Sequence, residues 1–198
     1  EKIKHAMPRI KGAYSLTIIT NDRLFGVRDP MGVRPLSMGA INGHGWVLAS
    51  ETCALDHIGA DFIREIDPGE IVSISENGVE SHRVESSKKA LCIFEYIYFA
   101  RPDSVIRGRL LYSTRLEMGK RLAQEHPVDA DFVIGVPDSA TAAAVGYSME
   151  SGIPMTEGLV KNRYVGRTFI EPDQRIRDLG VKVKFNPLPQ IVGNKRVV

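Results

Sequence analysis

Cysteine is scarce in this sequence, whose 198 residues include only Cys53 and Cys92. The two lie far apart and form no Cys-x-x-Cys pair, which argues against a disulfide scaffold and a zinc site and suits a reducing compartment. We therefore expect a cytoplasmic protein. The five histidines share no spacing that suits a metal site, so packing or surface roles are their default. They are His5, His44, His57, His82 and His126.

Charge imbalance and long apolar runs are missing as well. The formal net charge is +2, and no basic stripe marks a surface for nucleic acid. No apolar run has the length of a membrane span. We expect neither a nucleic-acid nor a membrane partner. Hydrophobic residues make up 43% and charged residues 25%, the composition of a folded chain of one ordinary or two small domains.

Residues 12–84 have the pattern of an antiparallel, strand-rich module. A turn is predicted at Asp29-Pro30-Met31-Gly32, and Asn77-Gly78 supplies the two positive-φ residues of a tight hairpin. A short helix is predicted between a Ser50 cap and Gly59. The predicted strands span 13–20, 24–28, 46–49, 71–75 and 79–84.

A polar break at residues 86–89 precedes a second pattern, in which strands alternate with helices. Helices are predicted from a Ser113 cap to Glu125, over 140–151 with Gly152 as the stop, and over 174–179. Strands are predicted over 132–136 and 155–160. Crossovers of this length indicate a parallel sheet covered by helices. The chain starts in a helix-like stretch and stops at residues 195–198, in what resembles half a buried strand, so both ends look cut.

The loop Pro137-Asp138-Ser139 places a carboxylate and a hydroxyl where a parallel strand ends and a helix begins. Ligands of open α/β sheets bind at that edge, and a helix N-terminus favours phosphate. Helix capping by Asp138 or Ser139 explains the same residues, and taken alone it is the favoured alternative.

The segment 161–169 holds three cations within seven positions, Lys161, Arg163 and Arg167, together with Tyr164 and Gly166. Such a segment suits a mobile flap that closes on a polyphosphate, with Gly166 as its hinge. A solvated surface loop is the alternative, and charge alone does not separate the two.

Several stretches, in order along the chain, are similar to the amidophosphoribosyltransferase family. The most specific are Phe94–Ser104 and Lys161–Ile170. The resemblance covers nearly the whole chain. The other stretches are Lys11–Tyr14, Arg28–Leu36 and Ala49–Ala54.

The resemblance implies a two-domain α+β and α/β protein, with part of an N-terminal-nucleophile (class II) glutaminase sheet domain over 1–85. Part of a type I phosphoribosyltransferase α/β domain follows over 90–198. It further implies that ammonia from glutamine passes through a channel to phosphoribosyl pyrophosphate (PRPP). The product, 5-phosphoribosylamine, begins purine synthesis. Glutamine and PRPP are then the substrates, Mg²⁺ is a cofactor, and the full-length protein is a homo-oligomer, a dimer or tetramer.

The same resemblance assigns the candidate site residues. Ser139 is expected near the PRPP-bound Mg²⁺, with Asp138 beside it, and the segment 161–169 is expected to fold over PRPP. Cys92 matches the first ligand of a [4Fe–4S] cluster in one branch of the family, with an inert buried thiol as the alternative. The PRPP-binding residues expected are Asp138, Ser139, Lys161, Arg163, Tyr164 and Arg167.

The chain also departs from the family pattern. Residue 1 is glutamate, where the family glutaminase carries its nucleophilic cysteine, and the paired-aspartate PRPP loop expected after Val198 is absent. We therefore expect no catalytic residue within these 198 residues and no activity from them alone. The alternatives are a non-catalytic PRPP-sensing regulator, a different amidotransferase and an interaction module without a ligand.

Overall fold

The computed structural model describes residues 2–43, 45–84 and 88–198. The described residues do not include Glu1, His44 or Ser86-Ser87, the first half of the predicted break. The chain forms two compact units, residues 1–111 and 112–198. Segment 90–111, which the sequence pattern places after the break, lies in the first unit.

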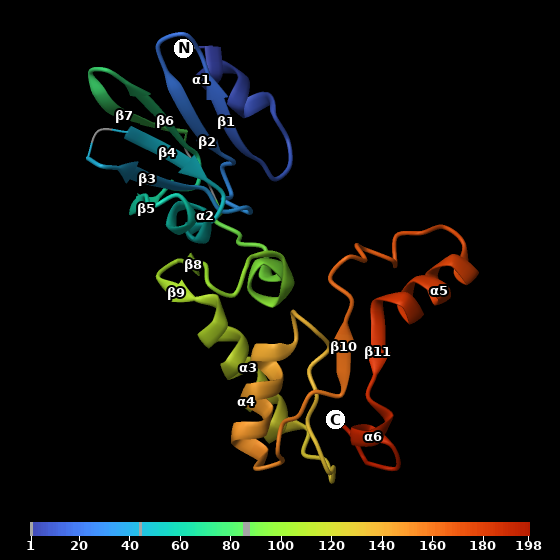
Figure 1. Cartoon of the computed structure of the whole chain (residues 1–198). Helices are drawn as coiled ribbons and strands as arrows, with labels where there is room; N and C mark the ends of the chain where they lie inside the picture. Colours follow the sequence, from blue (N-terminus) through green and yellow to red (C-terminus); the bar gives the residue numbers. More distant parts are fainter. Residues whose placement is uncertain (1, 44, 85–87) are drawn as a thin grey trace. The chain divides into compact units, whose positions relative to one another are not determined.

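The first unit contains two antiparallel sheets, ordered β1-β2-β6-β7 and β4-β3-β5 (Figure 1). The strands of the first sheet are β1 (Ser15–Ile19), β2 (Leu24–Arg28), β6 (Glu70–Ser75) and β7 (Gly78–Arg83). Those of the second are β3 (Ser37–Ile41), β4 (Gly45–Ala49) and β5 (Asp61–Glu65). All five predicted strands of this half are therefore present, while β3 and β5 were missed.

Successive side chains of a strand point to opposite faces of its sheet, so every second residue of the first sheet points toward the second sheet. In β6, Val72 and Ile74 pack with Leu36, Met38 and Ile66 in the core between the sheets. The alternate residue Ile71 packs with Met7 on the outer face, beneath α1 (Lys2–Ala6) and the 3-10 turn η1 (Met7–Arg9). The result is a sheet-on-sheet core with helical segments outside it.

The helix α2 (Thr52–His57) packs against the outer face of the second sheet. A Cβ on Gly39 of β3 would lie 3.0 Å from the Leu55 side chain of α2, so glycine permits this close approach. The predicted Ser50 cap is wrong, because the N-cap is the extended residue Glu51, whose side chain makes no capping bond.

Two predicted turns are borne out to different degrees. The Asp29–Gly32 turn is confirmed: the Asp29 carboxylate is fully buried and accepts hydrogen bonds from the N–H groups of Met31, Gly32 and Val33. The β6–β7 hairpin is confirmed too, but Ser75 pairs with Gly78. Its turn is therefore Glu76-Asn77, and of the predicted pair only Gly78 has positive φ.

The last part of the first unit starts with the π-helical turn η2 (Glu95–Phe99) and the short hairpin β8 (Val105–Ile106)–β9 (Arg109–Leu110). Ala90 and Cys92 donate backbone hydrogen bonds to the carbonyls of Met31 and Val33. These bonds tie the segment to the Asp29–Gly32 turn, which explains why residues 90–111 belong to the first unit.

The second unit has the three predicted helices and a short fourth one. They are α3 (Leu111–Glu125), α4 (Thr141–Ser151), α5 (Gln174–Lys184) and α6 (Pro189–Val192). The first residue of α3, Leu111, is the last residue of the first unit. The Ser113 cap is wrong, since α3 already begins at Leu111. Helix α4 does end at Gly152, whose φ of 74° is left-handed. Helix α5 extends five residues beyond the predicted Leu179, and Asp173 caps it.

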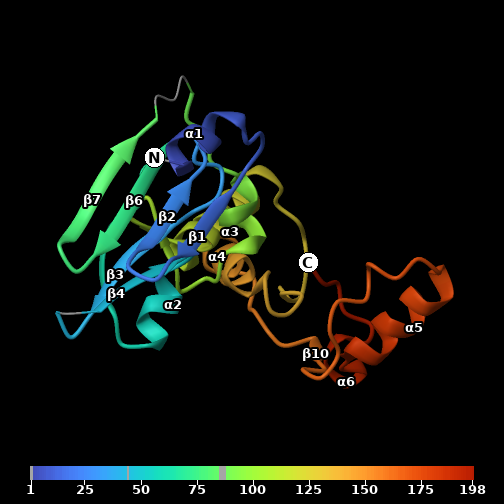
Figure 2. The ribbon, with the colours of Figure 1, turned by 90° about the horizontal axis from the view of Figure 1, so that it is seen from above.

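The predicted parallel sheet is present in a reduced form. Phe132 pairs in parallel with Val197, and Val133 pairs in parallel with Met155. The longer strands, β10 (Leu159–Lys161) and β11 (Phe185–Pro187), are antiparallel to one another and are both labelled in Figure 1. Figure 2 shows β10, α5 and α6 from a second direction. Val197 and Val198 are 38% and 36% exposed, so the last residues pair as a strand but are not buried as predicted.

Among the described residues, no helix combines the length and the apolar character needed to cross a membrane.

Candidate functional site

The loop before α4 presents the predicted carboxylate and hydroxyl to solvent. It follows the parallel pairing of Val133, and both Asp138 and Ser139 are exposed. The capping alternative is wrong: the N-cap of α4 is Ala140, and no side chain caps it. The N-terminus of α4, which carries the positive end of the helix dipole, therefore follows directly on a loop with two exposed polar side chains.

Lys161 joins the cationic segment to this loop. It is the last residue of β10, and its Nζ lies 2.5 Å from Asp138 Oδ2. The Asp138 side chain is 80% exposed and that of Lys161 is 27% exposed. An ion pair so open to water contributes about 0–1 kcal/mol, so an incoming phosphate can readily replace the carboxylate.

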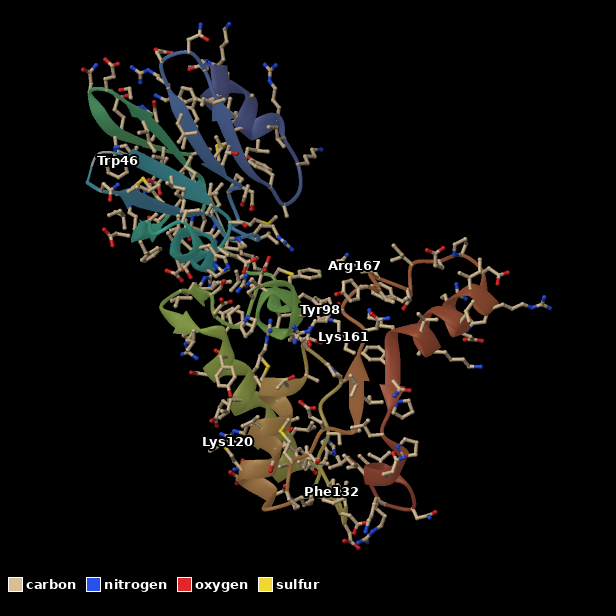
Figure 3. All side chains as sticks on the ribbon, in the orientation of Figure 1. Trp46, Tyr98, Lys120, Phe132, Lys161 and Arg167 are labelled. Carbon is tan, nitrogen blue, oxygen red and sulfur yellow. The ribbon has the colours of Figure 1, made fainter. Side chains whose placement is uncertain are left out.

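The other predicted PRPP ligands follow directly on β10. Figure 3 shows Lys161 on this strand and Arg167 in the segment beyond it. Arg163 and Arg167 are exposed, and Tyr164 is 100% exposed. Within the described part of the chain, the interactions that tie this segment to the loop before α4 run through Lys161. The structure thus brings Asp138, Ser139 and Lys161 together and leaves Arg163, Tyr164 and Arg167 in solvent.

Glu51 in the first unit joins two of the stretches that carry the family resemblance. Its Oε2 accepts hydrogen bonds from Arg101 N at 2.8 Å and from Ser104 Oγ at 2.7 Å. The adjacent Thr52 hydroxyl accepts from Val105 N. Glu51 was not predicted as a site residue, because its partners lie about fifty residues away and no local spacing reveals them.

A pocket of about 390 Å³ lies next to Glu51, within the first unit. Seven of its lining residues belong to the four resemblance stretches of this unit, and Ser15 and Leu16 complete the wall. The seven are Ala13, Tyr14, Arg34, Pro35, Ser50, Glu51 and Glu95.

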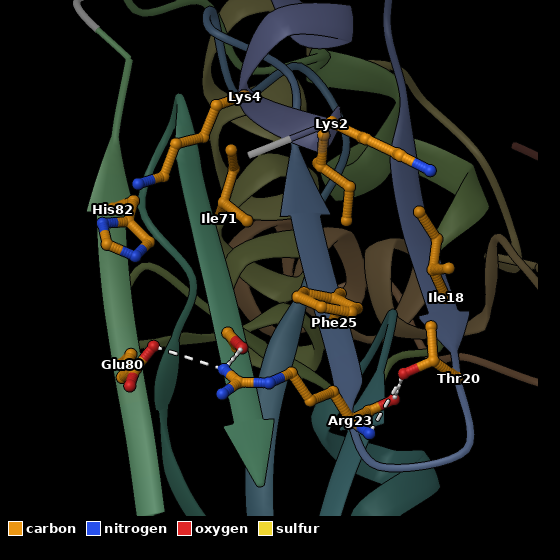
Figure 4. A pocket seen from close by; sticks show the side chains of 11 residues that line it. Lys2, Lys4, Ile18, Thr20, Arg23, Phe25, Ile71, Glu80 and His82 are labelled. Atoms are coloured by element: carbon orange, nitrogen blue, oxygen red, sulfur yellow. Dashed lines mark hydrogen bonds and ion pairs between the residues drawn. The ribbon is translucent and has the colours of Figure 1, made fainter.

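A second, more apolar pocket of about 490 Å³ lies on the outer face of the first sheet, beside α1 (Figure 4). Phe25 and Ile71 form part of its floor, and Arg23 bonds to Ser73 and Glu80 across its lower end. None of its lining residues belongs to a predicted site.

The two cysteines have different surroundings. Cys53 is buried, and its burial raises the pKa of the thiol, which keeps it protonated and poorly nucleophilic. Cys92 is half-buried rather than buried as predicted, and its neighbours Ile93 and Phe94 are exposed. The described residues contain no group of three or more His, Cys, Asp or Glu side chains able to hold a metal ion. Cys92 therefore has no partner ligands for an iron–sulfur cluster within the described part of the chain.

Sequence and fold comparisons converge on one family. Residues 1–57 match the model of a glutamine amidotransferase domain. Amidophosphoribosyltransferases of Mycobacterium tuberculosis and Synechocystis are 53% and 54% identical to this chain, over 97% and 98% of its length. The chain belongs, as a segment, to the amidophosphoribosyltransferase family. It spans 36% and 40% of the lengths of these two relatives.

Solved structures agree with this assignment. Glutamine PRPP amidotransferase from B. subtilis, in complex with ADP and GMP, is 48% identical with a TM-score of 0.89. The match covers 99% of this chain and 43% of the B. subtilis chain. A structure described as the allosteric regulatory enzyme of purine biosynthesis matches with 47% identity and a TM-score of 0.87.

Proposed function

We propose that this chain is part of an enzyme that transfers ammonia from glutamine to PRPP and forms 5-phosphoribosylamine, the first step of purine synthesis. The contact between Lys161 and Asp138 carries the proposal, because it sets a cationic segment against an uncapped helix N-terminus. The relatives of about 53% identity support an amidophosphoribosyltransferase rather than a PRPP-sensing regulator. The proposed domains are 1–85 for the glutaminase part and 90–198 for the phosphoribosyltransferase part.

The proposed role of the second unit is to hold PRPP. Its phosphate groups displace Asp138 from Lys161 and receive N–H donors at the start of α4. Arg163 and Arg167 then close over the ligand with Tyr164, which removes water from the reacting carbon. If Mg²⁺ binds here, the Ser139 hydroxyl would be one of the residue groups able to hold it, since this ion prefers hard oxygen ligands.

A chimera tests the proposal. Residues 1–198 replace the matching segment of the B. subtilis enzyme, which supplies the rest of the protein. We expect 5-phosphoribosylamine to form from glutamine and PRPP at a rate within about tenfold of the parent, since each tenfold corresponds to only about 1.4 kcal/mol of barrier. A folded chimera that binds PRPP without forming product would instead support the regulator.

Lys161→Ala in the chimera tests the site itself. Loss of a charge-assisted phosphate contact of about 1.5–3 kcal/mol predicts a rise of about 10- to 100-fold in KM for PRPP. Lys182→Ala, an exposed lysine of α5, is the matched control and should leave KM unchanged. Equal effects of the two substitutions would remove Lys161 from the binding site.

The proposal extends to a homo-oligomer in the cytoplasm, which suits the two free cysteines.

A further inference from the structure

The cationic segment, residues 161–169, begins and ends next to the helix α5. Its first residue, Lys161, lies in β10, and the N–H of Asn162 donates a hydrogen bond to the carbonyl of Lys184, the last residue of α5. The chain then turns back and enters α5 at its other end (Figure 1). The segment therefore starts beside the last residue of this helix and leads back to its first.

Gly180 of α5 lies against Thr168, near the far end of the segment. A Cβ on Gly180 would lie 2.9 Å from Cγ2 and 3.0 Å from Cβ of Thr168. Thr168 is half-buried, whereas its neighbours Arg167 and Phe169 are exposed. The φ of Gly180 is not positive, so the helix backbone does not require glycine there, and an interior glycine lowers helix stability. The missing side chain therefore serves the contact with Thr168.

Arg177, about one turn before Gly180, holds the residues that lead into the helix. Its Nη1 donates hydrogen bonds to the carbonyls of Glu171 and Pro172, at 2.6 and 3.0 Å. Its Nε and Nη2 donate to Gln174 Oε1, which fixes the orientation of the guanidinium. A planar group with several donors in a fixed geometry can make all these bonds at once. Arg177 therefore ties the returning chain to α5.

The middle of the segment is open by comparison. Within the described part of the chain, residues 166–170 form no hydrogen bond. Arg163, Tyr164 and Arg167 are exposed. A segment with few contacts between two fixed ends can change conformation at low cost, and the position of its ends limits how far its side chains reach.

We propose that Arg177 and Gly180 are positioning residues, which anchor the cationic segment to α5 and so set its reach toward PRPP. They act on the ligand through the segment and not by contact. By fixing the far end they raise the fraction of molecules whose segment can close, and the apparent affinity for PRPP rises with that fraction. The proposal rests on the proposed function for the identity of the ligand, whereas the anchoring is a property of the chain alone.

The first measurement tests the anchoring in the whole chain without PRPP, through the heteronuclear ¹⁵N NOE of the Thr168–Ile170 amides. Arg177→Ala should lower these values, because the carbonyls of Glu171 and Pro172 lose their donor. Arg175→Ala is the matched control: it removes the same charge from the same helix, and the Arg175 side chain makes no hydrogen bond or ion pair in the described part of the chain. Equal values in the parent and both variants overturn the proposal.

The second measurement tests the effect on PRPP in the chimera. Arg177→Ala should raise KM for PRPP on the order of 3- to 10-fold and leave kcat within about twofold, because saturating PRPP restores the closed segment. A merely structural role would instead lower kcat, through loss of folded enzyme, and leave KM unchanged. Arg177→Lys keeps the charge without the planar fork, so its KM should lie between the two. An unchanged KM in Arg177→Ala refutes its positioning role.

Gly180→Ala separates positioning from stability. Alanine is the better helix former, so the urea midpoint should stay or rise, while the new Cβ displaces Thr168 and should raise KM for PRPP on the order of 3- to 10-fold. Adding Thr168→Ala removes the Cγ2 atom that the new Cβ meets, so KM should return part of the way. An unchanged KM in Gly180→Ala, or a raised KM that Thr168→Ala does not reduce, refutes the role of Gly180.

Failure here is distinguishable from failure of the proposed function. An active chimera whose variants keep the parent KM discards only the positioning roles. A folded chimera that forms no phosphoribosylamine discards the proposed function and the effect on PRPP with it, and the NOE values still decide whether Arg177 anchors the segment.

Discussion

Among single residues, Glu70 carries a buried charge that several hydrogen bonds stabilise. It is 1% exposed, and burial alone would raise the pKa of its carboxyl. Hydrogen bonds from Arg64, Ser81 and the Asp67 N–H outweigh that effect and lower the pKa from 4.5 to about 2. The ionised form therefore stabilises the fold.

Glu70→Gln tests this contribution. Because the folded pKa is depressed, the stabilisation is fully present above about pH 4.5 and is lost as the pH falls toward about 2. We expect the variant to lose about 2–3 kcal/mol of unfolding free energy at pH 7, and progressively less below pH 4.5. Urea unfolding at pH 7 and pH 3 measures both values. A difference that does not depend on pH would assign the loss to packing.

At the candidate site, the contacts between residues could be predicted only where the residues stand in short polar segments. Asp138, Ser139 and Lys161 lie in short polar segments next to predicted elements, and the structure brings all three together. Glu51 and Glu95 contact residues that lie far away in the sequence, Ser104 and Arg34. Neither glutamate belongs to a local sequence pattern that predicts such a contact. The spacing of residues along the sequence does not predict contacts between such distant segments.

At the scale of elements, two glycines set the contact between α3 and α4. A Cβ on Gly146 would lie 1.9 Å from the Leu116 carbonyl oxygen, and a Cβ on Gly119 would lie 1.9 Å from that of Ala143. The obstacles are backbone atoms, which no rotamer change can move. The two helices therefore approach closely enough that only glycine fits at either position.

Gly146→Ala is expected to force these helices apart. Overpacking of this kind costs about 1–3 kcal/mol or more, and the added methyl group cannot offset it through helix propensity. Urea unfolding followed by far-UV circular dichroism measures the loss. Gly166→Ala is the matched control: a Cβ there meets nothing within 4 Å and its φ is not positive, so its stability should stay within about 0.5 kcal/mol of the parent.

The prediction of elements succeeded where periodicity or a stop residue was strong. Strands β2 and β6 and the end of α4 at Gly152 follow directly from pattern. The strand β3 was missed because its sequence, Ser-Met-Gly-Ala-Ile, has no alternation, and its pairing with β4 and β5 gives it strand structure. Its central glycine is explained by tertiary neighbours, since a Cβ there would lie 2.8 Å from the Asp61 carbonyl oxygen of β5 and 3.0 Å from the Leu55 side chain of α2.

At the scale of the whole chain, each unit has its own core. Leu36, Val72 and Ile74 belong to the core of the first unit, while Val133 and Tyr147 belong to that of the second. The break was predicted at residues 86–89 because polar composition marks it. The first unit nevertheless continues to Leu111, since buried Glu95 and Ser104 contact residues of the strand-rich half.

Separate cores predict separate responses to mutation. The one tryptophan, Trp46, lies on β4 of the first unit, so its fluorescence reports unfolding of that unit, whereas far-UV circular dichroism reports both. Glu70→Gln should shift the Trp46 transition to lower urea, and Gly146→Ala should leave it in place while shifting part of the circular dichroism signal. If the two units instead unfold as one cooperative body, both substitutions will move both signals together.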